Sequence, residues 1–229
     1  MRPLTTGDRC AFTIDLLVDE SRRNRGLPIL LEERVRAFAA DHGAGLLATL
    51  PNQEGMRTYE RLDGWRCIGV VRTLESAAPR DGVRPVNTRT SASIAFLKDA
   101  RWRDWRFARN PEYAYEPVSS PEGSMVWTKV FADPVSGLRS GDIVDYEIKE
   151  PAAFSRLIAE SCRQLRSQGV DKITLWMLPQ DERYQALIEM GFAVGIQERF
   201  FCVKPLGPET KSYEQLANWD LVEADSEVY

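Results

Sequence analysis

The feature that most constrains the fold is a basic, glycine-containing turn between an apolar stretch and a long helical pattern. Residues 11–18 are mostly apolar and predict a strand. Residues 27–42 repeat apolar side chains at helical spacing and predict a helix that ends at Gly43. Pro28 suits the first turn of this helix because an N–H there would have no intrahelical partner. The sequence therefore predicts a strand, a turn and a helix in succession.

The turn itself has the chemistry of an anion-binding site. Gly26 lets the backbone approach a ligand, and the first N–H groups of the helix are free of intrahelical partners. Arg22, Arg23 and Arg25 add full charges to the positive end of the helix dipole. A phosphate or pyrophosphate suits such a turn. Solvated arginines beside a plain turn glycine are the alternative interpretation of the same residues.

The pattern of strands and helices continues after the first helix. Residues 44–50 predict a buried strand, and a strand–helix–strand unit favours a parallel crossover. Asn52 is the expected N-cap of a second helix, which ends at Asp63-Gly64, and residues 65–74 predict the next strand. Residues 76–90 contain proline, glycine and charges with little to bury, and they predict a linker.

The last part of the chain repeats the first. The elements predicted there are a helix over 91–108, strands over 113–118, 125–132 and 142–148, a helix over 151–169, a strand over 173–180 and a helix over 180–191. Strand, long helix, strand, short helix and a glycine–aromatic pair thus occur twice, which indicates duplicated units. The second copy has Glu150 and no glycine at the turn, and Leu187 where the first copy has Tyr59.

Composition limits the partners that we expect. The 229 residues are 43% hydrophobic and 28% charged, as in a globular protein, and no apolar run is long enough to cross a membrane. A net charge of −4 argues against a nucleic-acid partner, because binding nucleic acid requires a broad basic surface. Four cysteines without CxxC spacing and a single histidine predict no metal site. We therefore expect a cytoplasmic protein with no membrane partner.

The first motif resembles the pyrophosphate-binding turn of the GNAT superfamily of acyl-CoA N-acyltransferases. That turn reads Arg/Gln-x-x-Gly-x-Gly/Ala and lies between a strand and a helix. It falls here on Arg23-x-x-Gly26-x-Pro28, so that proline replaces the last small residue. The resemblance implies that the turn binds the pyrophosphate of acetyl-CoA or another acyl-CoA.

The second signature of the superfamily follows at nearly the expected spacing. It is an asparagine, a tyrosine seven residues later and then a glycine–aromatic pair, and it falls on Asn52, Tyr59 and Gly64-Trp65, with Asp63 as one extra residue. The resemblance implies an α/β (α+β mixed) GNAT-like fold in tandem, strongly over 11–75 and by architecture over 91–206. A narrower likeness, carried by the tail 219–227, is to tandem GNAT proteins encoded beside bacterial polysaccharide-biosynthesis genes.

The resemblance also implies a domain organisation. We expect a GNAT-like acyl-CoA-binding half over 1–75, a linker over 76–90, a degenerate second domain over 91–206 and a tail over 207–229. Members of the superfamily place further strands before the pyrophosphate turn, whereas about ten residues precede the motif strand here. Either the chain is a truncated or alternatively started form, or the second copy supplies the sheet; an open sheet edge would favour a homodimer.

The site residues follow from the matched motifs. Tyr59 is the candidate acid for the departing thiolate, with a half-buried structural tyrosine as the alternative. Three carboxylates flank the motif strand as candidates for the base, Asp15, Asp19 and Glu20, and none is singled out. The residues expected to bind the acyl-CoA are Leu16, Val18, Arg23, Asn24, Arg25, Gly26, Leu27, Pro28 and Asn52, with the pantetheine paired along Leu16 to Val18.

Three functions fit these motifs. The first is an acyltransferase that moves an acetyl or acyl group from acyl-CoA to an amine of a small molecule, such as an amino-sugar, by direct attack. The second is a non-catalytic GNAT-like binding or scaffold module. The third, transfer from aminoacyl-tRNA, is disfavoured by the acidic charge.

Overall fold

The computed structural model describes residues 1–14, 18–23, 25–80, 92–207 and 211–226. Their contacts divide the chain into two compact units. Unit 1 holds the described parts of Met1–Val71, Ala92–Leu97 and Glu198–Asp220, and unit 2 holds those of Arg72–Ser91, Lys98–Gln197 and Leu221–Tyr229. Each unit therefore draws on segments that are far apart in the sequence.

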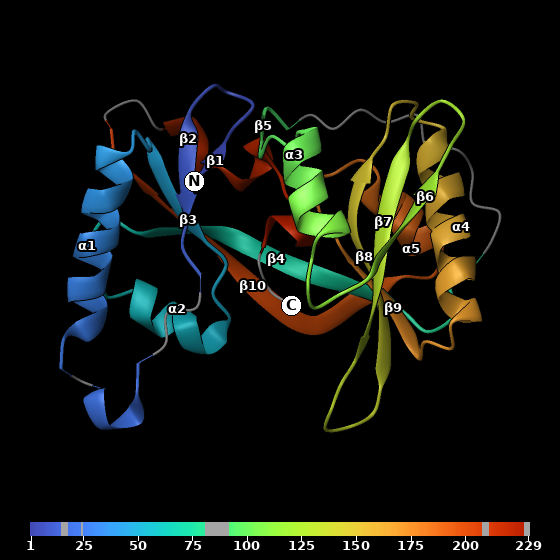
Figure 1. Cartoon of the computed structure of the whole chain (residues 1–229), viewed down its shortest axis with the longest axis horizontal. Coiled ribbons are helices and arrows are strands. Elements are labelled where there is room, and N and C mark those ends of the chain that lie inside the picture. Colours follow the sequence, from blue (N-terminus) through green and yellow to red (C-terminus); the bar gives the residue numbers. More distant parts are fainter. Residues whose placement is uncertain (15–17, 24, 81–91, 208–210, 227–229) are drawn as a thin grey trace. The chain divides into compact units, whose positions relative to one another are not determined.

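Unit 1 is built around the parallel strands β2 (Arg9–Phe12) and β3 (Leu46–Thr49). β1 (Arg2–Pro3) pairs with β2, and the end of β10 (Ala193–Pro205) pairs antiparallel with β3. A two-stranded parallel sheet joins β5 (Ile94–Ala95) to β11 (Trp219–Asp220). The helical elements are η1 (Glu20–Arg22), α1 (Leu27–Asp41), α2 (Gln53–Tyr59), η3 (Lys211–Glu214) and η4 (Leu216–Asn218), of which Figure 1 labels α1 and α2.

Unit 2 has a sheet in the order β4-β9-β8-β7-β6. β8 and β9 run parallel in the register Ser140↔Lys172 to Ile143↔Leu175, and the other neighbours run antiparallel. The strands are β4 (Arg66–Ser76), β6 (Tyr115–Ser119), β7 (Met125–Ala132), β8 (Arg139–Glu147) and β9 (Lys172–Trp176). The helical elements are α3 (Ala100–Arg103), the π-helix η2 (Asp104–Ala108), α4 (Ala153–Ser167), α5 (Tyr184–Glu189) and η5 (Glu223–Asp225).

Two strands explain why the units interleave in sequence. β4 follows α2 in the chain, yet its residues 73–76 pair with β9. β10 follows α5, yet its residues 202–205 pair with β3. The pair β2 and β3 is thus extended by β10, which comes after β8 and β9 in the sequence. The pair β8 and β9 is extended by β4, which comes after β2 and β3. This grouping by contacts does not test the duplicated copies expected over 1–75 and 91–206, which remain a prediction.

The main core of unit 2 lies between α4 and the sheet. α4 carries apolar residues at helical spacing, and Phe154, Leu157, Ile158 and Leu165 pack with strand residues of β7, β8 and β9. Unit 1 has a smaller cluster, in which Ala39 of α1 packs with Leu47 of β3 and Ala11 of β2. α1 is therefore placed on β2 and β3 by a short contact near its end.

Several predicted elements are confirmed. The helix predicted over 27–42 is α1, the strand predicted over 44–50 is β3, and the strand predicted over 125–132 is β7. Asn52 caps α2, since its side chain accepts the Gly55 N–H at 2.9 Å. None of the helices in the described ranges is long and apolar enough to cross a membrane.

Two predicted elements are wrong. The strand expected over 11–18 begins at Arg9 and ends at Phe12, because its partner β3 ends at Thr49 and the last ladder bond runs from Thr13 N to Ala48 O. The helix expected over 91–108 is replaced in its first part by β5. Its apolar residues Ile94 and Phe96 alternate along extended chain, and α3 begins only after Asp99. Residues 81–90 of the expected linker lie outside the described residues.

Candidate functional site

Two of the matched residues of unit 1, Asn52 and Tyr59, lie at the carboxyl ends of β2 and β3. Thr13 follows β2 directly, and Asn52 follows β3 after two residues. In α/β sheets, ligands bind outside the carboxyl ends of parallel strands, where helices begin. This end of the parallel pair is therefore the candidate functional site.

Tyr59 reaches this end of the sheet from the last turn of α2. Its side chain is 7% exposed, and its hydroxyl lies 3.4 Å from Thr13 Oγ1. Thr13 is fixed in turn by a backbone bond from its N–H to Ala48 O at 2.8 Å. The phenol thus sits at the point where the chain leaves β2 for the basic turn. The sequence offered no signal for Thr13, which is 46 positions away from Tyr59.

The basic turn opens α1. Gly26 adopts a left-handed conformation with φ 72°, which other residues rarely adopt, and a Cβ built there would meet nothing within 4 Å. Its carbonyl accepts the N–H groups of Ile29 and Leu30, and Pro28 has no N–H to offer. The space at Gly26 and the exposed Arg22 and Arg25 fit an anionic group at the start of α1.

Other residues predicted to bind acyl-CoA or to act as the base are less well placed for these roles. Arg23 donates from Nε to Val18 O at 3.3 Å, so its guanidinium folds back onto the loop. Val18 belongs to no strand, which leaves the expected pairing of pantetheine with a strand at this residue without support. Asp19 is exposed, and hydrogen bonds from Ser21 hold the pKa of its carboxyl below the usual value. Leu16, Asn24 and Asp15 lie outside the described residues.

An ion pair that the sequence did not indicate lies beside Trp65, the aromatic neighbour of Tyr59. Trp65 packs its ring edge-on against Tyr59, with 4.9 Å between the ring centroids. Its indole N–H donates to Glu32 Oε1 of α1 at 3.3 Å, and Lys204 of β10 donates to the same oxygen at 2.6 Å. Glu32 and Lys204 are 172 positions apart, a separation at which a single sequence gives no pairing signal.

The equivalent place in unit 2 is filled by the chain itself. Near the end of β8, Tyr146 packs edge-on against Phe154 in the first turn of α4, with ring centroids 5.7 Å apart. The Arg183 guanidinium lies 4.8 Å from the Tyr146 ring centre and 5.4 Å from that of Phe154, and its Nε donates to Asp181 at 2.8 Å. Side chains of unit 2 thus occupy the start of α4.

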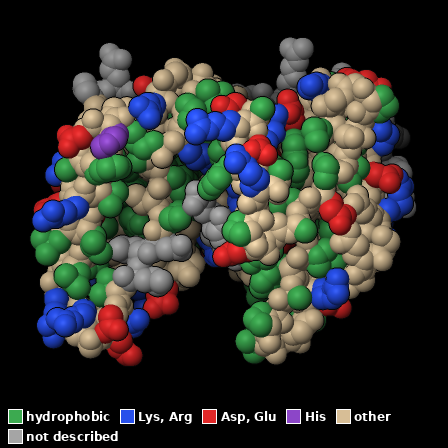
Figure 2. Space-filling model, in the orientation of Figure 1, with side chains coloured by type: hydrophobic (Ala, Val, Ile, Leu, Met, Phe, Trp, Pro, Cys, Tyr) green, Lys and Arg blue, Asp and Glu red, His purple; other side chains and the backbone are tan. Residues whose placement is uncertain are grey.

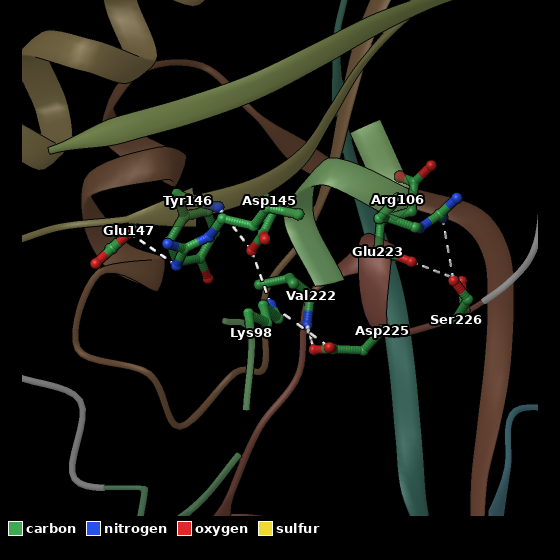
Figure 3. A network of polar contacts seen from close by, with 10 residues as sticks. Lys98, Arg106, Asp145, Tyr146, Glu147, Val222, Glu223, Asp225 and Ser226 are labelled. Carbon is green, nitrogen blue, oxygen red and sulfur yellow. Dashed lines mark hydrogen bonds and ion pairs between the residues drawn. The ribbon is translucent and has the colours of Figure 1, made fainter. Parts of the chain in front are cut away.

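Unit 2 also contains a network of acidic and basic side chains (Figure 3). Lys98 Nζ lies between two aspartates, 2.8 Å from Asp145 and 3.4 Å from Asp225. Lys129 Nζ lies in the same way between a strand residue and a tail residue, 3.8 Å from Asp142 and 3.6 Å from Glu223. Each lysine thus joins one carboxylate of β8 to one carboxylate of η5.

Burial changes the protonation of these carboxyl groups. It raises the pKa of Glu223 to about 8, against the attraction of Lys129. It also raises the pKa values of Asp142 and Asp145. Thr174 donates to Asp142 at 2.5 Å, and the Lys129 ammonium lies 4.8 Å from the Tyr113 ring centre. Burial therefore favours the protonated form of Glu223.

The surface of α1 is unusually apolar. Figure 2 shows hydrophobic side chains gathered over this helix, with the histidine beside them. Phe38 stacks on His42 with 4.0 Å between the ring centroids, and His42 forms the C-cap of α1. The exposed apolar side chains of α1 are Ile29, Leu30, Leu31, Val35 and Phe38. Among the described residues, no cluster of three or more His, Cys, Asp or Glu side chains could hold a metal ion.

Comparison with known proteins identifies the fold. No family model matches the sequence, and no curated protein matches it. Among solved structures, a GCN5-related N-acetyltransferase from Anabaena variabilis aligns with 86% of this chain and 55% of its own at TM-score 0.60 and 12% identity. An N-myristoyltransferase from Saccharomyces cerevisiae, solved with bound myristoyl-CoA and inhibitors, aligns with 89% of this chain and 63% of its own at TM-score 0.60 and 9% identity.

Further solved structures agree. Eis1 from Mycobacterium abscessus aligns with 90% of this chain and 59% of its own at TM-score 0.55 and 15% identity. This chain spans between 52% and 63% of the length of six solved chains that it matches. The likeness concerns backbone architecture, since these identities are low. The protein therefore has the mixed α/β fold that GCN5-related N-acetyltransferases share.

Proposed function

We propose that the protein is an acyl-CoA-dependent N-acyltransferase whose site lies at the carboxyl ends of β2 and β3 in unit 1. The observation that carries this proposal is the position of Tyr59. Its hydroxyl meets Thr13 at the end of β2, and the chain runs on from there to the Gly26 turn. The candidate acid lies on the helix that follows β3, and the candidate anion-binding turn lies between β2 and α1.

In this proposal the acyl-CoA pyrophosphate binds at the start of α1. Arg23 and Arg25 supply charge, the backbone N–H groups of Gly26 and Leu27 supply hydrogen-bond donors, and Asn52 fixes the start of α2. The fold neighbours support an acyl-CoA co-substrate, since one was solved with myristoyl-CoA. Tandem copies, the association with polysaccharide biosynthesis and a homodimer through a sheet edge remain proposals from the sequence.

The transfer requires one bond to form and one to break. The acceptor amine attacks the thioester carbonyl carbon, and the C–S bond breaks as the carbonyl is restored. A base first takes a proton from the acceptor ammonium, so that the free amine can attack. The Tyr59 phenol gives its proton to the departing thiolate and regains one from solvent. An amine of a small molecule is the acceptor class, with amino-sugars the first to test.

Calorimetric titration with acetyl-CoA, followed by an assay of free thiol release with a panel of amines, tests the proposal. We expect saturable binding, acylation of at least one amine, and a fall in kcat of about 100-fold in Tyr59→Phe, a typical loss for a general acid. Tyr184→Phe on α5 is the matched control and keeps full activity. Binding without any acylation would instead support a non-catalytic binding module.

A further inference from the structure

Glu32 joins three parts of unit 1 beside Tyr59. Its Oε1 accepts from the Trp65 indole and from the Lys204 ammonium. Both members of the ion pair are largely removed from water, with side-chain exposures of 11% for Glu32 and 12% for Lys204. A buried ion pair adds little net stability because desolvation opposes the attraction between the charges. Its geometry is therefore more informative than its energy.

Lys204 fixes the turn that leads into Trp65. Besides Glu32, its ammonium donates to Asp63 O at 2.7 Å. Gly64 then takes a left-handed conformation with φ 75°, and a Cβ built on it would lie 3.1 Å from Lys204 Cε. The lysine stem thus passes directly beside the glycine. The backbone before Trp65 and the indole N–H are therefore held by the same ion pair.

Trp65 passes this constraint to Tyr59. The two rings meet edge to face, with an interplanar angle of 70°. Such contacts favour one relative orientation, because the edge of one aromatic ring is attracted to the face of the other. The Tyr59 hydroxyl is then within 3.4 Å of Thr13. A continuous series of contacts runs from α1 through Glu32, Trp65 and Tyr59 to the end of β2.

We propose that Glu32 is a positioning residue, which holds Trp65 so that the Tyr59 hydroxyl stays at the end of β2. Because Glu32 lies on α1, it also links the Tyr59 hydroxyl to the helix that begins at the Gly26 turn. This inference rests on the proposed function in one respect, since it gives Tyr59 the role of the acid. The position of the Tyr59 ring can be measured without any activity.

The first arm of the test is fluorine NMR on the full chain labelled with 3-fluorotyrosine, with the Tyr59 resonance assigned by Tyr59→Phe. We expect Glu32→Ala to shift and broaden this resonance. Glu32→Gln keeps an acceptor for the indole and restores a narrow line. Glu33→Ala, at an exposed neighbouring position on α1, is the control and leaves the resonance unchanged. An unchanged Tyr59 resonance in Glu32→Ala overturns the proposal.

The second arm separates positioning from stability by a double-mutant cycle. Glu32→Ala lowers kcat about tenfold while the KM for acetyl-CoA stays within about twofold, which corresponds to a coupling of ordinary size between residues of one contact network. In the Tyr59→Phe background the same change lowers kcat by less than about twofold. An equal loss in both backgrounds contradicts the proposal. If the wild type transfers no acyl group, the proposed function fails, while the fluorine spectra still decide the role of Glu32.

Discussion

Two helices of equal length occupy equivalent places in the two units but differ in what they bury. α1 and α4 each have 15 residues and each follow the first strand of a parallel pair. α4 buries eight side chains in the core of unit 2. All residues of α1 are described, and among them only Ala39 is buried. Burial thus fixes α4, whereas α1 is held by the cluster around Ala39 and by Glu32.

The starts of the two helices also differ, because side chains cover the start of α4 but leave the start of α1 exposed. At α4, Arg183 covers Tyr146 and Phe154, so the chain closes its own strand–helix junction. At α1, a left-handed glycine leaves open space and arginines stand at the surface. The same order of elements can therefore serve as a closed core or as an open junction. The open junction is the one that we propose binds the ligand.

The largest expected difference is in stability. Leu157 and Leu31 each stand four residues after the first residue of their helix, yet Leu157 is 1% exposed and Leu31 46%. Leu157→Ala should lower the free energy of unfolding by about 2–5 kcal/mol through lost packing. Leu31→Ala should cost about 0.5 kcal/mol or less, as surface changes do. Urea unfolding measures both, and equal costs would show that the α1 face is covered in solution.

A pH dependence should arise in unit 2. The pKa of Glu223 in the folded protein is about 8. Folded Glu223 therefore keeps a proton that the unfolded chain loses near the ordinary pKa of 4.5. The native state therefore binds more protons across that window, and stability falls as the pH rises from about 4.5 to about 8. Glu223→Gln should flatten this fall in melting temperature. The exposed Glu189→Gln on α5 should leave it in place, and an unchanged slope in both variants would refute the assignment.

Reversing one charge at the start of each helix should weaken acetyl-CoA binding at α1 but not at α4. Arg23→Glu places a carboxylate three residues before Gly26 and should weaken acetyl-CoA binding about tenfold or more, as expected for lost attraction to a phosphate. Arg156→Glu makes the same change in the first turn of α4, where the side chain is exposed, and should have no effect. Calorimetric titration of both variants with acetyl-CoA measures the two affinities. Equal weakening by both would mean a general charge effect.

The smallest effect should come from the start of α2. Asn52 accepts the Gly55 N–H, whereas no side-chain cap bond is made at the start of α5. Asn52→Ala should cost about 1 kcal/mol of stability, the usual cost of a lost cap, and Asn52→Asp should restore it. Thermal unfolding gives the comparison. A cost near zero for the alanine variant would mean that the contacts of α2, rather than its cap, hold the helix.

The sequence predicted local structure better than long-range pairing. The apolar period of α1 and the cap at Asn52 were sufficient to place two helices, since both signals lie within a few residues. Periodicity reports an apolar face but not whether anything covers it, so the exposure of Phe38 could not be foreseen. The pairing of β10 with β3, and of Glu32 with Lys204, depends on contacts between distant segments.

Hydrogen–deuterium exchange with and without acetyl-CoA tests most directly whether the open junction of unit 1 is the acyl-CoA site. We expect slower exchange on binding in peptides that cover residues 18–30 and 52–60, where the α1 turn and α2 lie. We expect no change over residues 146–156, where the α4 junction is closed by Arg183. Protection over 146–156 alone, or protection in neither region at saturating acetyl-CoA, would contradict this assignment.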